Sequence, residues 1–565
     1  MPIGLQAPPQ ETRQEDRISG EGETVETNDE DVTLVVDAGD IEPLEPKSLA
    51  EAKRRPEWPE WEKAIYEELK TLEEAGTWEI SDLPEGANLV GSKWVFRIKK
   101  DASGRVVRYK ARLVAQGFSQ VEGVDYFDTY APVVKLSSLR TILALAVRLD
   151  LELDQIDIKG AYLNGELTDD EIIYMWQPPG YPYPNANGRV LRLRKTIYGL
   201  KQSGRRWYQK LTAICRETMG LTRCNVDQAV FYRHSNSSIL IMAVHVDDCT
   251  IAAHPPELVV ELKEKLGSRV EVTDLGKLHW LLGIEIARDR HARTIQLSQQ
   301  SYIEEIVRRY GFHNERPLSL PMGANVKLST SQSPKTPEDI AAMRNIPYRE
   351  AVGSLMYASL GTRPDITFAV TRLSKFLQNP GKAHWEAVRN VLHYLNGTWM
   401  HWLIFGEKEA NLIGWVDADG SQEEDRRAFT GYAFLIDGGA VSWSSKQQEI
   451  VVLSTTEGEY VAATHAAKEA LWLRSFIGEV FGSTLTPTTL FSDNKSAIAL
   501  SRDHQYHART KHIDIQYHFI RWVIEDGSIR LVFCPTEDMI ADTLTKPLPS
   551  TKAKHFATEL GLRQP

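Results

Sequence analysis

The sequence predicts an α+β fold that is followed by a separate α/β domain. The chain has 565 residues, too many for one ordinary core, and 42% of them are hydrophobic, which is enough to fill several cores. Helical and strand-like patterns both occur before residue 411. From residue 411, three strand patterns precede a helix and a further strand, an order that is typical of an α/β domain.

The elements of the first part can be predicted in chain order. Residues 47–76 predict a lead-in helix that ends at a glycine suited to a C-cap. Residues 93–115 predict two strands joined by the turn "DASG". Residues 136–150 have the i, i+3, i+4 apolar spacing of a helix, and "LELDQID" after them alternates as a half-buried strand. The run "SSILIMAVHVDDCTIAA" predicts a hairpin with two acids at its turn.

The net acidity of the chain is confined to its first segment. Residues 1–46 hold 13 acids and 2 bases and lack aromatic residues, so they are predicted to form a disordered leader. The other 519 residues carry 64 acids and 64 bases. A polar stretch rich in Ser, Thr, Gln and Lys predicts a linker over residues 326–345.

Several protein classes are excluded by these patterns. No basic segment followed by an apolar stretch begins the chain and no long apolar run occurs in it, so we expect neither a signal peptide nor a membrane span. The four cysteines lie far apart, which argues against a disulfide framework and a cysteine zinc site and favours a reducing compartment. They are Cys215, Cys224, Cys249 and Cys534.

Two stretches concentrate basic charge. Residues 93–112 hold eight bases and one acid, and residues 189–210 hold eight bases and no acid, with Tyr198, Trp207 and Tyr208 among them. Bases mixed with aromatic residues suit a surface that neutralises phosphates and stacks on nucleobases. A solvated basic face is the alternative interpretation of either stretch alone.

Asp247 and Asp248 stand side by side between two apolar runs. Two unit charges about 4 Å apart repel by roughly 4 kcal/mol at an effective dielectric constant near 20, and a divalent cation removes that cost. A solvated turn also explains the pair when it is taken alone, since turns commonly contain Asp. A third acid, Asp157, ends a predicted strand further upstream. Three such carboxylates form a hard oxygen site for Mg²⁺, the site used in two-metal chemistry on a nucleoside triphosphate.

Seven motifs occur in a characteristic order. They are "KWVFRIKKDASGRVVRYKARLVAQGFSQVEGVDYFDTYAPVVK", "QIDIKGAYLNGEL", "IYGLKQSGRRWYQKL", "HVDD", "DLGKLHWLLGIEI", "AVGSLMYASLGTRPDITFAV" and "DMIADTLTKPLP". Together they resemble the polymerase region of copia-group LTR retrotransposons, a reverse transcriptase followed by ribonuclease H. The resemblance runs from about residue 47 to the carboxyl end.

The resemblance implies a right-hand polymerase with fingers, palm and thumb over residues 47–325, a connection segment over 346–410, and an α/β ribonuclease H-like domain over 411–565. It implies copying of retrotransposon RNA into DNA and cleavage of RNA in RNA/DNA hybrids, with two Mg²⁺ ions in each active site and Mn²⁺ as a substitute. The expected partners are an RNA template, a DNA primer, RNA/DNA hybrid, deoxynucleoside triphosphates and other products of the element's polyprotein, with no membrane. The expected location is the cytoplasm, in virus-like particles, from which the DNA product enters the nucleus.

The resemblance also assigns residues in the polymerase. Asp157, Asp247 and Asp248 match its metal-binding triad, and Gly283 in "LLGIEI" falls where the family holds the primer end. Four residues match positions around the incoming nucleotide. They are Lys110 and Arg112 near the triphosphate, Tyr162 at the ribose 2′ position, and Gln202 against the nucleotide and template. A core aromatic is the alternative interpretation of Tyr162.

The carboxyl-terminal domain holds a second set of acids. In "STTEGEYVAATHAAKEALWL", Ser454 and Glu457 have the spacing of a capping box, which explains Glu457 as part of a helix start. The resemblance assigns two-metal RNA cleavage to four other acids. They are Asp417, Glu459, Asp493 and Asp542. Asp419 is the neighbouring alternative to Asp417, and Glu457 to Glu459.

The chain departs from the family's pattern in several places. His245 replaces the Tyr that usually begins the hairpin tetrapeptide, Gly204 and Arg206 replace the usual Pro and Ala, and no Trp follows "DAD". The alternative function is therefore an inactive or host-recruited copy that binds nucleic acid without catalysis. The cluster "HQYHARTKHIDIQYH" fits no zinc spacing, and its histidines are expected to contact nucleic acid or to pack locally.

Overall fold

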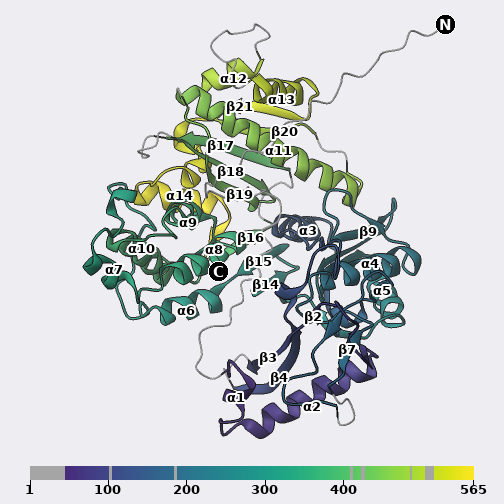
Figure 1. Cartoon of the computed structure of the whole chain (residues 1–565). Helices are drawn as coiled ribbons and strands as arrows, with labels where there is room; N and C mark the ends of the chain where they lie inside the picture. The colour runs from purple at the N-terminus through teal and green to yellow at the C-terminus, as the bar shows by residue number, and fades with distance from the viewer. Residues whose placement is uncertain are drawn as a thin grey trace, which may run out of the picture. The chain divides into compact units, whose positions relative to one another are not determined.

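The computed structural model describes residues 45–100, 105–183, 188–406, 411–420, 427–452, 454–483, 486–502 and 514–564, which all belong to one compact unit (Figure 1). Three predictions concern residues outside this set. Most of the leader, the "DASG" turn and the histidine cluster up to residue 513 lie outside the described residues, as does the side chain of His518.

The first described segment packs a helix against a hairpin. The predicted lead-in helix is found as two helices, α1 (Leu49–Ala52) and α2 (Trp58–Glu74), and the predicted strand pair is β3 (Ser92–Lys100) with β4 (Val106–Ala115). Trp61 of α2 lies edge-on against Phe96 and Tyr109 of the hairpin, so α2 buries its apolar face there. A four-stranded sheet combines two strands from this segment with two strands from residues 174–193. Its strands are, in order, β1 (Trp78–Ser81), β7 (Val190–Leu193), β6 (Tyr174–Met175) and β2 (Leu89–Val90).

The central sheet has six strands, and both of its faces are covered. Their order is β12 (Val272–Lys277), β5 (Glu152–Ile158), β11 (Asp248–His254), β10 (Ile239–His245), β9 (Val230–His234) and β8 (Thr222–Arg223). Ile241 joins the core that contains α3 (Leu136–Arg148), the helix predicted for 136–150. Met242 joins the core of α4 (Ser203–Glu217) and α5 (Glu257–Gly267). Neighbouring residues of one strand thus serve opposite layers, because strand side chains alternate.

A third sheet joins distant parts of the chain. Its strands are β13 (Trp280–Leu281), β14 (Ile284–Asp289), β15 (Thr294–Ser298), β16 (Trp402–Phe405) and β22 (Leu562–Arg563). Five helices lie between β15 and β16 in sequence, and all of them except α7 contribute to a second core. They are α6 (Gln300–Arg309), α7 (Pro337–Met343), α8 (Tyr348–Gly361), α9 (Thr367–Ser374) and α10 (Lys382–Thr398).

The stretch predicted as a linker over residues 326–345 contains α7 and is therefore not entirely irregular. The amide of Asp339 donates to the hydroxyl of Thr336, which caps α7, and Pro337 occupies the first turn. A capping Thr followed by Pro and acids is a helix start, and the polar composition of the stretch obscured it.

The carboxyl-terminal sheet is mixed, in agreement with the predicted α/β class. Its strands are β19 (Gly439–Gln447), β18 (Phe429–Ile436), β17 (Ile413–Asp419), β20 (Thr488–Ser492) and β21 (Ile529–Phe533). The first three are antiparallel, and β20 and β21 run parallel to β17. The long helix α11 (Thr455–Phe481) packs on this sheet (Figure 1). The remaining helices are α12 (Lys495–Arg502), α13 (Asp514–Glu525) and α14 (Ser550–Glu559).

One apolar core runs from the central sheet into the carboxyl-terminal sheet. It contains Leu143 of α3, Ile295 of the third sheet and Val416 of β17. The four cysteines are buried and unpaired. Among the described residues, no helix has both the length and the apolar character needed to cross a membrane.

Candidate active sites

The first candidate site is built on the hairpin of β10 and β11. The two strands pair from Ile239 to His245, so that His245 lies opposite Asp248 and only Val246 and Asp247 form the turn. Val246 has a φ of 60°, and its carbonyl accepts a 2.7 Å hydrogen bond from the indole N–H of Trp207 on α4. The predicted hairpin is confirmed, with Asp247 in its turn and Asp248 as the first residue of β11.

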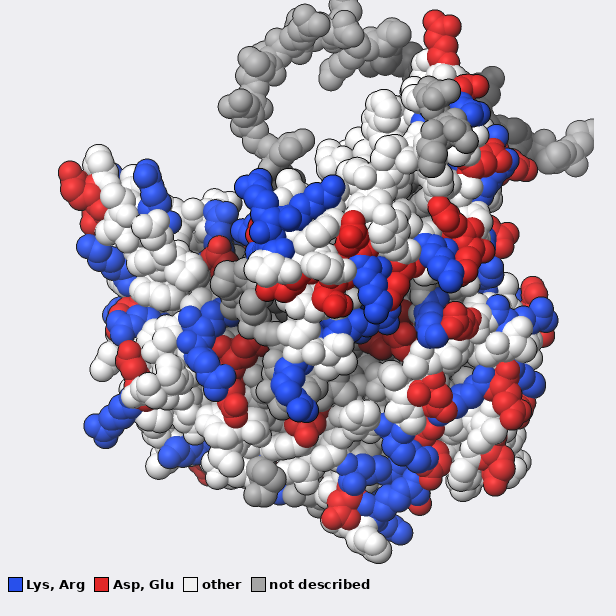
Figure 2. Space-filling view, turned by 90° about the horizontal axis from the view of Figure 1, so that it is seen from below, with Lys and Arg blue, Asp and Glu red and all other residues white. Residues whose placement is uncertain are grey.

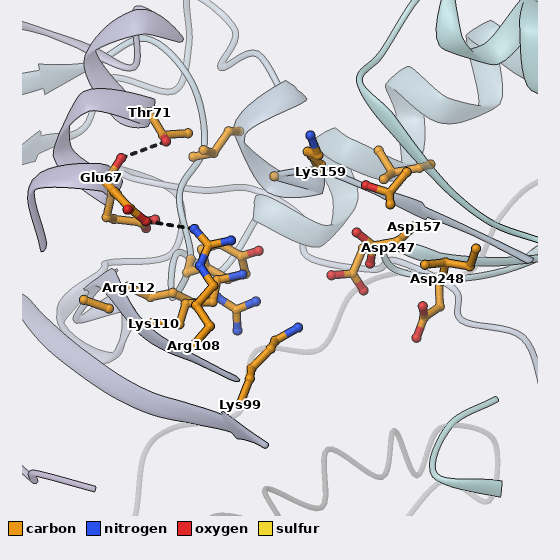
Figure 3. Close-up of a pocket in the computed structure, with 18 of the residues that line it drawn as sticks. Glu67, Thr71, Lys99, Arg108, Lys110, Arg112, Asp157, Lys159, Asp247 and Asp248 are labelled. Carbon is orange, nitrogen blue, oxygen red and sulfur yellow. Dashed lines mark hydrogen bonds and ion pairs between the residues drawn. The ribbon is translucent and has the colours of Figure 1, made fainter. Parts of the chain in front are cut away.

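Asp157 reaches the same place through the neighbouring strand. β5 runs antiparallel to β11, and Asp157 lies directly opposite Asp248. The amide of Ile158 donates to the carbonyl of Asp247 over 2.9 Å, which ties the turn to the end of β5. The three predicted carboxylates therefore meet at one sheet edge (Figure 3).

The charges of these acids are not neutralised within the described chain. Burial, followed by the nearby charges of Asp247 and Asp157, raises the pKa of Asp248 to about 6. Burial and Asp247 also raise the pKa of Asp157. No described Lys or Arg forms an ion pair with any of the three. Clustered carboxylates without a protein counter-charge suit a divalent cation.

A basic wall faces the acids across a cavity of about 850 Å³ (Figure 3). Lys99 from β3 and Lys110 and Arg112 from β4 line it, and no described acid forms an ion pair with them. Burial and the charges of Arg112 and Lys99 lower the pKa of Lys110. Arg108 differs, because Glu67 of α2 binds it at 2.8 Å. Three unpaired cations on one wall form a site for a polyanion.

Outside the cavity, charges of both signs are interspersed. On the face shown in Figure 2, Lys and Arg side chains alternate with Asp and Glu in small groups. This agrees with the equal numbers of acids and bases after residue 46. On this face the two signs are therefore mixed, whereas the cavity wall presents Lys99, Lys110 and Arg112 together.

Gly283 also lines the cavity, at the turn between β13 and β14. Leu282 and Gly283 have φ values of 49° and 73°, which the turn requires. The hydroxyl of Tyr357 on α8 donates to the carbonyl of Leu282, and a Cβ added to Gly283 would lie 2.5 Å from that hydroxyl. Glycine is thus required both by conformation and by the close tyrosine.

The other two predicted nucleotide-binding residues do not line the cavity. Tyr162 is half-buried behind it, with its ring edge-on to Tyr198 at 5.1 Å. Gln202 is fully buried, and its side chain donates to the carbonyl of Asp125 and accepts from Gln120. These two hydrogen bonds connect Gln202 to the segment 117–125. The contact of Gln202 with nucleotide and template stays a prediction.

The second candidate site lies in the carboxyl-terminal sheet. Asp417 ends the buried part of β17, Asp493 follows β20, and Glu459 lies on the first turns of α11. One carboxylate oxygen from each lies within 4.8 Å of the others. Among the described residues, no other group of three His, Cys, Asp or Glu side chains brings its ligand atoms this close together. The Ser454 hydroxyl accepts from the amide of Glu457, as predicted for the helix start.

The donors of this group fit a hard divalent metal. Mg²⁺ binds oxygen at about 2.1 Å, so ligands on opposite sides of the ion lie about 4.2 Å apart. Glu459 is only 6% exposed, and its Oε2 atom has no hydrogen-bond partner. Burial and the charges of Asp417 and Asp493 raise the pKa of Glu459. A cation between the three would satisfy that oxygen and remove the repulsion.

Asp542, the fourth predicted acid, is held by lysines. Lys546 lies 2.7 Å from it and 3.3 Å from Asp417, and Lys552 lies 2.8 Å from it. Neither lysine was predicted from the sequence, although "DTLTK" places Lys546 four residues after Asp542, a spacing that brings side chains together on a helical turn. The structure therefore groups three of the four acids and connects the fourth through Lys546.

Comparison with known proteins gives a consistent result. Residues 75–324 match the family described as reverse transcriptase (RNA-dependent DNA polymerase). The Retrovirus-related Pol polyprotein from transposon TNT 1-94 of Nicotiana tabacum is 43% identical over 509 residues, which are 90% of this chain and 38% of the relative. The transposon Ty5-1 protein of Saccharomyces cerevisiae is 31% identical over 317 residues, which are 56% of this chain and all of the relative.

A crystal structure of an RNase H1 in complex with an RNA/DNA hybrid is similar to 24% of this chain and 94% of its own, at 13% identity and a TM-score of 0.19, too low to support any conclusion. The chain spans only about two fifths of the tobacco relative's length. The identities, the matched region and the order of motifs all agree. The chain belongs to the family of copia-type LTR retrotransposon Pol polyproteins, of which it contains the reverse transcriptase region.

Proposed function

We propose that this chain is an RNA-directed and DNA-directed DNA polymerase that also cleaves RNA in RNA/DNA hybrids. The observation that carries the proposal is the cavity in which Asp157, Asp247 and Asp248 face Lys110 and Arg112. Nucleotidyl transfer needs cation ligands on one side of a triphosphate and positive charge on the other. The substrates are deoxynucleoside triphosphates and a DNA primer on an RNA or DNA template.

The roles of the polymerase residues follow from their placement. Lys110 and Arg112 bind the triphosphate oxygens, and the planar guanidinium of Arg112 can bind two of them at once. Asp157, Asp247 and Asp248 hold two Mg²⁺ ions, for which Mn²⁺ can substitute. Ions held by these three carboxylates would supply the Lewis acidity that activates the primer 3′-hydroxyl and stabilises negative charge on the α-phosphate. The turn at Gly283 positions the primer terminus beside the acids.

The second site acts on the RNA strand of a hybrid. Asp417, Glu459 and Asp493 supply the metal ligands. Asp542 completes the set, and Lys546, which forms ion pairs with both Asp542 and Asp417, offsets the repulsion between their carboxylates while no metal is bound. The buried position of Asp417, which is 1% exposed, favours it over Asp419 as a ligand.

We also propose the finer organisation implied by the resemblance. Residues 47–325 form fingers, palm and thumb, residues 346–410 form a connection segment, and residues 411–565 form the ribonuclease H-like domain. The enzyme works in cytoplasmic virus-like particles with other products of its polyprotein. Fluorescence microscopy of the tagged chain, coexpressed with those products, tests the location.

A primer-extension assay tests the polymerase. With Mg²⁺ and an RNA template, the wild-type chain should extend a DNA primer. Asp247→Asn should abolish extension, since it removes a metal-binding charge, and should leave hybrid cleavage intact. A wild-type chain that binds the primer–template but extends nothing would support the alternative of an inactive copy.

Hybrid cleavage tests the second site separately. Asp493→Asn should abolish cleavage of a labelled RNA strand and retain primer extension. The two variants are reciprocal controls, because each loses one carboxylate and should keep the other activity. Unchanged cleavage in Asp493→Asn would refute the assignment of the compact acidic group.

A further inference from the structure

Tyr198 occupies a place in the cavity that neither the motifs nor the proposed mechanism explains. Its ring lines the cavity, and it contacts two residues that the resemblance assigns to opposite ends of the nucleotide. On one side the Arg112 guanidinium lies over the ring, 4.5 Å from its centroid. On the other side the ring of Tyr162 lies edge-on at 5.1 Å and 73°. Tyr198 therefore lies between the triphosphate-binding arginine and the tyrosine of the ribose position.

The contact with Arg112 has a specific electrostatic effect. No described acid forms an ion pair with Arg112, and its buried Nε has no hydrogen-bond partner. An aromatic face attracts a guanidinium without occupying its N–H donors in the way a carboxylate does. Tyr198 thus fixes the direction of the guanidinium and leaves its remaining donors for phosphate oxygens.

The backbone of Tyr198 is tied to the same strand that carries Arg112. The amide of Ala115, at the end of β4, donates to the carbonyl of Tyr198 over 2.8 Å. Gly199 has a φ of 92°, and a Cβ added there would lie 2.1 Å from the carbonyl oxygen of Ala115. Only glycine permits this approach, so the sequence "YG" is required to keep the ring in register with β4.

The contact with Tyr162 connects this assembly to the acids. Tyr162 lies on a short 3₁₀ helix, Ala161–Asn164, that follows β5 and therefore Asp157. The carbonyl of Tyr162 accepts a 2.5 Å hydrogen bond from Thr196, two residues before Tyr198. The rings of Tyr162 and Tyr198 are consequently held together by both side-chain and backbone contacts. Because Tyr198 lines the cavity and Tyr162 packs against it from behind, a shift of the Tyr198 ring would change the space left for the sugar, and Tyr162 limits such a shift.

We propose that Tyr198 is a positioning residue for nucleotide selection: its ring orients Arg112 toward the triphosphate and supports Tyr162 at the sugar, so that phosphate binding and exclusion of ribonucleotides depend on one side chain. This inference rests on the proposed polymerase function. It adds a residue through which the two ends of the nucleotide site are coupled.

The experiment measures equilibrium binding, which does not require turnover. A DNA primer that ends in a dideoxynucleotide is annealed to an RNA template and bound by the full chain, and the dissociation constants of dATP and ATP are measured with Mg²⁺ by calorimetry. In Tyr198→Leu the dATP constant should rise by about tenfold, the loss expected for a partly desolvated cation–π contact, and the preference for dATP over ATP should fall by a similar factor. Tyr198→Phe, which keeps the ring, should retain both values.

Two controls separate positioning from general damage. Tyr181 is a half-buried tyrosine with edge-on contacts to Tyr66 and Trp94 and does not line the cavity, so Tyr181→Leu should leave both constants unchanged. In a double-mutant cycle, the effects of Tyr198→Leu and Arg112→Lys on dATP binding should be less than additive.

The outcomes also distinguish the two proposals. If the wild-type complex binds neither nucleotide, the polymerase function fails and this inference fails with it. If the wild type binds dATP preferentially and Tyr198→Leu keeps the same constants and the same preference, the polymerase function stands and the role of Tyr198 is refuted. Equal weakening of dATP and ATP in Tyr198→Leu would also refute the coupling, since the preference would then be unchanged.

Discussion

At the scale of single residues, the polymerase acids depend on a turn of unfavourable conformation. Val246 is β-branched and has a φ of 60°, a region that costs such a residue about 1–2 kcal/mol. The turn is maintained by the hydrogen bond from Trp207 and by the bond between Ile158 and Asp247. His245, where the family usually has Tyr, lies in the last paired position before this turn. The orientation of Asp247 is thus determined by neighbours that carry no charge.

Trp207→Phe tests this dependence. The variant removes the donor to the Val246 carbonyl, which leaves a partly buried acceptor unpaired, and should lower the free energy of unfolding by about 1–2 kcal/mol. The kcat of primer extension should fall by about ten- to a hundredfold because the acids lose their alignment. Hybrid cleavage should be unchanged.

Trp94→Phe is the matched control for this prediction. Trp94 is also buried and also donates to a backbone carbonyl, that of Pro179, and it does not line the cavity. It should lose similar stability and retain kcat. If both variants lose kcat equally, the bond to Val246 has no special role.

At the scale of elements, the start of α10 is capped by a neutral histidine. The amide of Gly381 donates to Nδ1 of His384 over 2.8 Å, so Nε2 carries the proton and donates to the carbonyl of Ser329 at 3.1 Å. The imidazole is fully buried and stacks on Phe376. Burial lowers its pKa, and a protonated ring could not accept the bond from Gly381. The cap therefore requires the neutral form.

This cap predicts a loss of stability in mild acid. Because the folded pKa of His384 lies below its unfolded value near 6.5, the unfolded chain binds the proton more readily and stability falls as the pH drops below about 6.5. The melting temperature of the wild type should fall more between pH 7 and pH 5.5 than that of His384→Gln, whose amide accepts the bond at both values. Equal slopes in scanning fluorimetry would contradict this prediction.

At the scale of the whole molecule, one apolar core extends beneath both candidate sites, and the buried side chain of Arg140 connects elements on its two sides. From α3 the side chain donates to the carbonyl of Val441 on β19 and to those of Leu360 and Gly361 at the end of α8. Its guanidinium also lies 3.9 Å from the ring centroid of Trp443. Arg140 therefore connects α3 to two segments far away in sequence, β19 and the end of α8, and the two sites are expected to unfold together.

Arg140→Met should destabilise the whole chain. Three carbonyls lose a donor and the half-buried Glu469 loses one of its two nearby positive charges, which together should cost about 4 kcal/mol of unfolding free energy. Extension and cleavage should both decline at the same temperature, and calorimetry should show one lowered transition. Arg148→Met, at the exposed end of the same helix, is the control and should change little. Two separate transitions would contradict a shared core.

Local patterns predicted the elements on which the first three acids lie, and long-range pairing was not predictable. Asp157 at a strand end and Asp247 at a hairpin turn follow from alternation and turn composition. That Asp157 lies directly opposite Asp248 depends on the pairing of β5 with β11, which no periodicity encodes. Gln202 was predicted at the nucleotide and is buried in a network with Gln120, because a motif specifies a residue's position and not its partners. The lysines of Asp542 and the helix α7 were missed for similar reasons.

The pairing of β16 with β22 brings the two ends of the carboxyl-terminal region together. Leu403 lies opposite Leu562, so the chain leaves the third sheet and returns to it on adjacent strands, which lie about 4.8 Å apart. The carboxyl-terminal sheet and its helices are in effect an insert between neighbouring strands, the arrangement in which whole domains are most easily exchanged. A foreign nuclease could be grafted between residues 406 and 561, provided that its surface covers the apolar side of α3 and accepts Arg140. The same geometry would allow evolution to replace one processing activity without rebuilding the polymerase.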